Sequence, residues 1–179
     1  MQSSDTYDFS GLEAMLKGLG AFEDEALLAL VKERSGTNLK HPKRDYPPAV
    51  GAHIATIIRE YYFPDLNEND GLVELGRAIA RGYGKTIIGQ VQTAALKIVT
   101  INRALQILVK MLSSAANFGE RNLVKIDEQN YVIQFRGDLG NVYIAEGIIK
   151  QFVANQGIHH ASVKAQVINS RDFDINISW

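Results

Sequence analysis

Apolar residues recur at helical spacing along residues 71–116, a stretch of the chain that contains no proline. Steps of three and four residues over this length predict helix. A break near Thr100 or Asn102 divides the stretch into a central helix and a second helix over residues 101–114, and the polar residues 67–70 supply N-caps for the central helix. The second helix is apolar over much of its circumference, so we expect it to lie in the interior.

Two stripes of residues run along the central helix. The bulky stripe, which should face the core, consists of Leu72, Leu75, Ile79 and Tyr83. The small stripe consists of Ala78, Gly82, Thr86, Gly89 and Thr93. A glycine in a helix interior costs about 1 kcal/mol relative to alanine, so a close neighbour must compensate for this loss.

The small stripe has two interpretations, which periodicity alone does not separate. Tight packing of another helix, within or between subunits, is the more common use of a helical glycine and is favoured here. In the second interpretation the stripe forms one wall of a ligand pocket. The residues lining that pocket are then Leu75, Ile79, Gly82, Tyr83, Thr86, Leu105 and Leu108.

Shorter amphipathic patterns precede the central helix and predict three further helices. These cover residues 9–19, 23–34 and 50–63. Three prolines in residues 37–48 forbid regular helix there, so this segment is predicted to be a polar linker. Its basic cluster belongs either to an exposed loop, which is favoured, or to a site for an anionic partner. The cluster consists of His41, Lys43 and Arg44.

The pattern changes after residue 117 from helical spacing to alternation of apolar and polar residues. Alternation predicts strands. The expected elements are strands over 122–127 and 131–136, a helix over 139–155, and strands over 161–168 and 172–179. We therefore predict an α+β fold and a single domain over residues 1–179. A helical part over 9–116 packs on a C-terminal antiparallel sheet of about four strands, arranged β-β-α-β-β over 122–179.

Composition narrows the possible functions more than it identifies one. The formal net charge of −1 argues against binding nucleic acid through its phosphates. The absence of cysteine rules out disulfides and thiolate metal sites. The N-terminus lacks the pattern of a signal peptide, and polar residues interrupt the apolar run over 87–112, so no membrane span is expected. These features favour a cytoplasmic protein.

No combination of residues is typical of a catalytic centre, so we do not expect an enzyme. The chain contains no GxSxG elbow, and the GYGKT sequence at 82–86 lacks the first glycine of a phosphate-binding loop because Ile79 occupies that position. Asp172 and Asp174 share a strand face, where a solvated surface is favoured over acid–base catalysis. The four histidines lack the spacing of a metal site, and their roles stay open. They are His41, His53, His159 and His160.

Several of these segments together resemble a bacterial domain family of unknown function, known as an expanded paralogous family in myxobacteria. The resemblance spans nearly the whole chain. It rests on FSGLEAMLKGLG near the start, Asp45-Tyr46-Pro47, YYFPD over 61–65, LGRAIARGYGKTIIG, and the final strand that ends in tryptophan. That family is more distantly similar to the heme nitric-oxide sensor domain, to the vinyl-reductase-type small-molecule domain, and to trafficking-complex subunits that hold an acyl chain.

The resemblance implies helices packed on an antiparallel sheet, with an apolar cavity between them, in an intracellular and often dimeric sensor. It carries over no heme ligand. The heme sensors use a Tyr-x-Ser-x-Arg motif, which Tyr131-Val132-Ile133 with Arg136 does not match, and a helical histidine, which residues 71–116 lack. The cofactor stays unknown. We expect a dimeric module that binds an apolar or amphipathic small molecule; the alternative is a protein-interaction scaffold without a small ligand.

Overall fold

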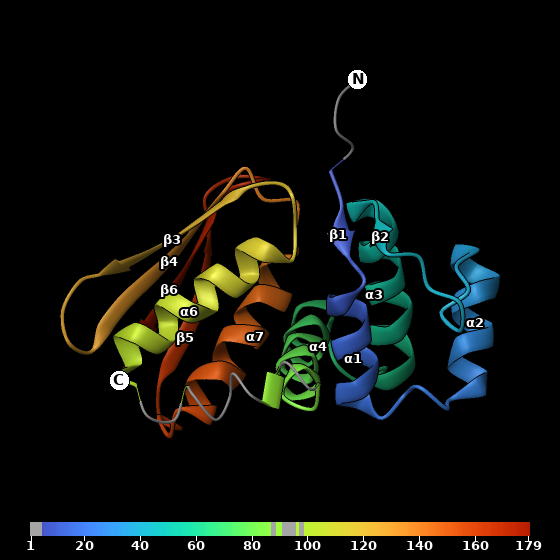
Figure 1. The fold of residues 1–179 in the computed structure, drawn as a ribbon, viewed down its shortest axis with the longest axis horizontal. Helices are drawn as coiled ribbons and strands as arrows, with labels where there is room; N and C mark the ends of the chain where they lie inside the picture. Colours follow the sequence, from blue (N-terminus) through green and yellow to red (C-terminus); the bar gives the residue numbers. More distant parts are fainter. Residues whose placement is uncertain (1–4, 87–88, 91–95, 97–98) are drawn as a thin grey trace.

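The computed structural model describes residues 5–86, 89–90, 96 and 99–179, and its elements follow the predicted order. The helices in this part of the chain are α1 (Ser10–Leu19), α2 (Glu25–Ser35), α3 (Pro48–Tyr62), α4 (Glu68–Tyr83), α6 (Ile101–Ser114) and α7 (Val142–Asn155). The strands are β1 (Tyr7–Asp8), β2 (Asp45–Tyr46), β3 (Glu120–Lys125), β4 (Asn130–Arg136), β5 (Ser162–Val167) and β6 (Phe173–Ser178). The predicted α+β class is confirmed, with helices first and the main sheet last (Figure 1).

Helix α4 lies between α1 on one side and α7 on the other (Figure 1). On the α1 side, a Cβ atom added to Gly82 would lie 1.7 Å from the carbonyl oxygen of Ala14. A Cβ added to Gly18 of α1 would lie 1.9 Å from the carbonyl oxygen of Ala78. Both distances are far below van der Waals contact, so the two helices meet backbone to backbone. The favoured interpretation of the small stripe, tight helix packing, describes this contact.

A second pair of glycines brings α4 against α7. A Cβ added to Gly76 of α4 would lie 2.1 Å from the carbonyl oxygen of Ile144, and one added to Gly147 of α7 would lie 2.0 Å from that of Val73. Glycines therefore allow close helix packing on two sides of α4, and α4 joins the N-terminal helices to the C-terminal half.

The central helix ends earlier than predicted. It stops at Tyr83, and Gly84 to Thr86 form a turn where we expected continuous helix. The Thr86 hydroxyl donates to the carbonyl oxygen of Tyr83 at 2.8 Å and accepts from the backbone N–H of Gly89 at 2.9 Å. Threonine therefore competes with helical hydrogen bonds here, and the small stripe does not continue along one helix. Thr93 lies outside the described residues.

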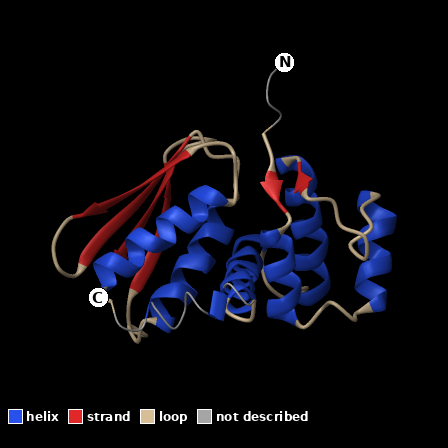
Figure 2. Ribbon diagram, in the orientation of Figure 1, coloured by secondary structure: helices blue, strands red, loops and turns tan. Residues whose placement is uncertain are grey.

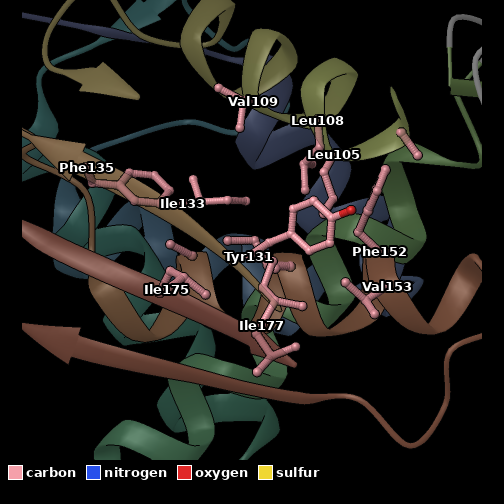
Figure 3. Packing of buried hydrophobic residues seen from close by; sticks show 14 of the residues in the cluster. Leu105, Leu108, Val109, Tyr131, Ile133, Phe135, Phe152, Val153, Ile175 and Ile177 are labelled. Atoms are coloured by element: carbon pink, nitrogen blue, oxygen red, sulfur yellow. The ribbon is translucent and has the colours of Figure 1, made fainter. Parts of the chain in front are cut away.

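The main sheet is antiparallel in the order β3-β4-β6-β5, and α6 and α7 pack against it (Figures 1 and 2). Tyr131 pairs with Ile177 and Ile133 with Ile175, so the buried faces of β4 and β6 are in register. Figure 3 shows Leu105 and Leu108 of α6 pointing toward this face. The predicted alternation is confirmed, although β3 begins two residues before the predicted strand.

Buried side chains form two clusters rather than one. One cluster lies among the sheet, α6 and α7, and the other among α1, α2, α3 and α4. Within the described residues, no helix is long and apolar enough to cross a membrane.

The predicted polar linker over 37–48 contains a short strand that the sequence did not indicate. Strand β2 pairs with β1, and Phe9 donates its N–H to the carbonyl oxygen of Arg44 at 2.8 Å. The same N-terminal segment reaches the other half of the molecule, because Asp8 donates its N–H to the carbonyl oxygen of Ala115 at 3.2 Å. Residues 7–9 therefore tie the helical half to the start of the sheet half.

Candidate functional site

A cavity of about 490 Å³ lies where the two buried clusters meet. Helices α1, α3, α4, α6 and α7, strands β1 and β2, and the loop over 138–141 contribute to its wall. Most of the wall is aliphatic or aromatic. Its apolar side chains include Leu12, Met15, Ala55, Ile79, Leu108, Met111, Leu112, Phe135, Ile144, Ile148, Phe152 and Phe173.

Three of the seven residues predicted to line a pocket do line this cavity, namely Ile79, Tyr83 and Leu108. The other four lie elsewhere, each for a physical reason. Leu75 and Leu105 are fully buried in the helical and sheet clusters, and Thr86 forms the turn after α4. Gly82 is occupied by its contact with α1. Of the small stripe, Gly82 and Thr86 thus do not line this cavity, whereas Ile79 and Tyr83 of the bulky stripe do.

Helix α3 supplies a part of the wall that the sequence analysis missed. Gly51, Ala52 and Ala55 all line the cavity. A Cβ added to Gly51 would meet only the ring of Tyr7, at 4.0 Å, so free space adjoins this glycine. The clustering of small residues in VGAHIA was the available signal, because such clusters leave room beside a helix.

A buried ion pair forms the polar end of the cavity. Arg121 Nη2 of β3 lies 2.5 Å from Asp138 Oδ2, and the side chains are 4% and 2% exposed. The backbone N–H of Gly140 donates to Asp138 Oδ1 at 2.6 Å. The guanidinium lies between the rings of Phe118 and Phe135, at 5.9 and 5.8 Å from their centroids. These contacts hold a charged group in place beside an otherwise apolar wall.

Tyr7 completes the polar end of the cavity. Its ring packs edge-on against Phe118 with centroids 4.8 Å apart, and its hydroxyl lies beside Gly140. Burial raises the pKa of Tyr7 well above its ordinary value, and the negative charge of Asp138 raises it further. The hydroxyl therefore stays protonated. No hydrogen bond from it is formed with any described residue, which leaves a donor facing the cavity.

The histidines stand apart from the cavity. All four are exposed, and none of the described residues that line the cavity is a histidine. His53 contacts the carbonyl oxygen of Arg34 at 3.1 Å, in agreement with a surface hydrogen-bonding role. Over the described ranges, no group of three histidine, cysteine or acidic residues is arranged to hold a metal ion.

Solved structures of H-NOX proteins share this fold. An Fe(II) unliganded H-NOX point mutant from K. algicida matches with a TM-score of 0.68 at 9% identity, covering 96% of this chain and 95% of that chain. An H-NOX protein from S. oneidensis in the Fe(II)NO ligation state matches with a TM-score of 0.61 at 10% identity, covering 95% and 96%. At such identities the likeness shows the fold alone.

A histidine-ligated heme does not fit the residues of this cavity. Helix α6 carries no histidine. The buried face of β4 carries Tyr131, Ile133 and Phe135. This face therefore offers neither the serine nor the arginine of the Tyr-x-Ser-x-Arg motif. The described residues of the cavity therefore offer no histidine to such a heme.

Sequence comparison gives the family. No curated protein matches the chain. A family model for proteins of unknown function, DUF2378, matches residues 8–179. This match confirms the resemblance to a family of unknown function, and the fold agrees with the more distant likeness to heme nitric-oxide sensors. The chain thus belongs to DUF2378, a family without an assigned function, and has the fold of the H-NOX proteins.

Proposed function

We propose that this protein is a non-enzymatic sensory module that binds an apolar or amphipathic small molecule in the cavity between its two halves. The observation that carries the proposal is the cavity itself. Its volume of about 490 Å³ is within the usual range for small-molecule sites. Its wall is mostly apolar with a few polar groups, which is the usual composition of such sites.

The fold supports a ligand-binding role. The similar structures are of H-NOX proteins in the Fe(II) unliganded and Fe(II)NO ligation states. In this chain the described residues that line the cavity include no histidine. We therefore propose a ligand other than a histidine-bound metal cofactor. An uncoordinated organic molecule needs only apolar contact and a few hydrogen bonds.

The residues around the cavity support a non-enzymatic role. Its described lining contains no histidine, lysine or cysteine to act as a base or nucleophile. Arg121 and Asp138 neutralise each other, and the Ser10 hydroxyl donates to Asp8 without a histidine beside it. These groups suit binding and orientation rather than bond making.

Signalling through a homodimer in the cytoplasm belongs to the same proposal. The alternative is a scaffold without a ligand, in which the glycines pack against another subunit. Gly76 and Gly82 already pack against α7 and α1 of their own chain, so they offer that scaffold no exposed surface. Light scattering during size-exclusion chromatography measures the mass of the assembly, and a monomer at all concentrations contradicts the dimer.

Titration with an uncharged apolar fluorophore, N-phenyl-1-naphthylamine, tests the binding proposal. We expect saturable binding to the wild type. Gly51→Leu fills the space beside α3 and should weaken binding by about tenfold or more, which corresponds to about 1.4 kcal/mol.

Two variants serve as controls. Gly51→Ala adds only the first carbon at the same position. Ala29→Leu also introduces a leucine, but on the exposed face of α2, away from the cavity. Both should bind like the wild type. A folded protein that binds no fluorophore, or a Gly51→Leu variant that binds it equally well, contradicts the proposed function.

A further inference from the structure

The polar end of the cavity restricts which chemical groups the head of the ligand can carry. Arg121, Asp138 and Tyr7 come from β3, from the loop before α7 and from β1, and they all line the cavity. The fold thus brings together a buried cation, a buried anion and a protonated hydroxyl at a mostly apolar wall. The second carboxylate of the wall, Asp8, is half-buried and accepts a hydrogen bond from the backbone N–H of Ser10 at 2.9 Å.

The charge of Arg121 is already neutralised. Its Nη2 atom lies 2.5 Å from Asp138 Oδ2, and both side chains are almost completely buried. A ligand carboxylate beside this pair would add an uncompensated negative charge in a poorly solvated place, and an ammonium group would add an uncompensated positive one. Buried charges without a partner are strongly unfavourable.

Hydrogen-bonding capacity remains at the same place. A guanidinium carries five N–H donors, and the two contacts that Arg121 makes through its Nη atoms, to Asp138 and to the carbonyl oxygen of Phe118 at 3.4 Å, use only part of them. The Tyr7 hydroxyl adds a further donor. Asp138 Oδ2 accepts no hydrogen bond of good geometry from the described residues, although it forms the ion pair. Arg121 and Tyr7 therefore offer hydrogen-bond donors beside the cavity, and the buried Arg121–Asp138 pair carries no net charge, whereas Asp138 Oδ2 itself is enclosed by its neighbours.

We infer that the ligand is an amphiphile with an uncharged, hydrogen-bonding head, such as a long-chain alcohol, seated at Tyr7, Arg121 and Asp138 with its chain along the apolar wall. This inference rests on the proposed function and specifies its ligand class. It distinguishes the ligand from a fatty acid and from an alkylamine of the same length.

Displacement of N-phenyl-1-naphthylamine by three probes of equal chain length tests the inference: 1-decanol, decanoate and decylamine. In the wild type at neutral pH, we expect 1-decanol to displace the fluorophore at a concentration about tenfold or more below those of the two charged probes. Equal or better displacement by decanoate or decylamine overturns the inference. The fluorophore is uncharged and lacks the hydroxyl head of the alcohol, so its own affinity reports on the proposed function separately.

Tyr7→Phe removes only the hydroxyl and keeps the ring contact with Phe118. We expect 1-decanol to bind about 3- to 10-fold more weakly, the usual effect of one hydrogen bond, with fluorophore affinity and the unfolding midpoint unchanged. Unchanged 1-decanol affinity in this variant also overturns the inference.

Asp138→Asn keeps an oxygen for the N–H of Gly140 but leaves Arg121 without its counter-ion. In this variant decanoate should become the preferred probe, because its carboxylate restores neutrality. A folded Asp138→Asn protein that still prefers 1-decanol contradicts the charge argument. Should this variant not fold, the wild-type ranking and Tyr7→Phe decide the question.

Discussion

At Gly51 of α3 and Gly82 of α4, the missing side chain leaves very different surroundings. A Cβ added to Gly82 would collide with the backbone of α1, whereas one added to Gly51 would reach the cavity with the Tyr7 ring 4.0 Å away. The sequence shows the same residue type in a helix in both cases. The neighbours decide whether glycine permits close packing or leaves space for a ligand.

Gly51→Ala should stabilise the protein by about 0.5–1 kcal/mol, because alanine is the better helix former and nothing within contact distance opposes the methyl group. Urea unfolding followed by circular dichroism measures the change. A lower stability than the wild type would show that the space beside Gly51 is filled.

Gly82→Ala should have the opposite effect. The added methyl group forces α4 and α1 apart, because the nearest atoms belong to the backbone and cannot rotate away. We expect a loss of about 1–3 kcal/mol, the usual cost of overpacking, in the same urea experiment. A neutral result would mean that the two helices do not approach as closely as described.

The residues at the polar end could not be predicted from local patterns. Tyr7, Arg121 and Asp138 are far apart in the sequence, so no spacing rule connects them, and Arg121 and Asp138 read as ordinary surface charges. Ile79 and Tyr83 were found because they share the periodic apolar face of one helix. Periodicity detects a face, but it does not tell which part of that face adjoins a cavity.

At the scale of elements, the order of helices and strands followed from periodicity because most elements have one buried and one solvated face. The errors lie where local chemistry outweighs that pattern. Thr86 closes a turn inside an apolar run, and β1 and β2 are only two residues long, too short to show alternation.

Asp24 joins two elements through one carboxylate. Its Oδ1 accepts from the N–H of Leu27 at 3.0 Å and caps α2, and the hydroxyls of Tyr61 and Tyr62 of α3 donate to its two oxygens. The bond from Leu27 holds the pKa of Asp24 below its ordinary value of 3.8, and the bond from Tyr62 adds to the effect. A carboxyl whose pKa is lowered on folding stabilises the folded state only while it is ionised.

Asp24→Ala should therefore lower the thermal unfolding midpoint at neutral pH through loss of the cap. The difference from the wild type should be full above pH 3.8 and should shrink as pH falls through the lowered pKa of the folded state. Thermal unfolding of both proteins across this range measures it. An equal difference at neutral and strongly acid pH would contradict an ionised cap.

At the scale of the whole molecule, the cavity exists because two separate apolar clusters meet without merging. Helix α4 joins the halves through its glycines, and β1 joins them again by pairing with β2 and by bonding to Ala115. A ligand in the proposed site would contact both halves at once, because residues of both halves line the cavity. Its binding would then change the relative position of the halves, as the proposed sensor role requires.

Native mass spectrometry after incubation with 1-decanol tests the central claim most directly, because it counts molecules held per chain. We predict one 1-decanol adduct per wild-type chain and the loss of that adduct in Gly51→Leu, with Ala29→Leu behaving like the wild type. A wild-type spectrum of the bare chain, or the same adduct in Gly51→Leu, would contradict an interior site between the two halves.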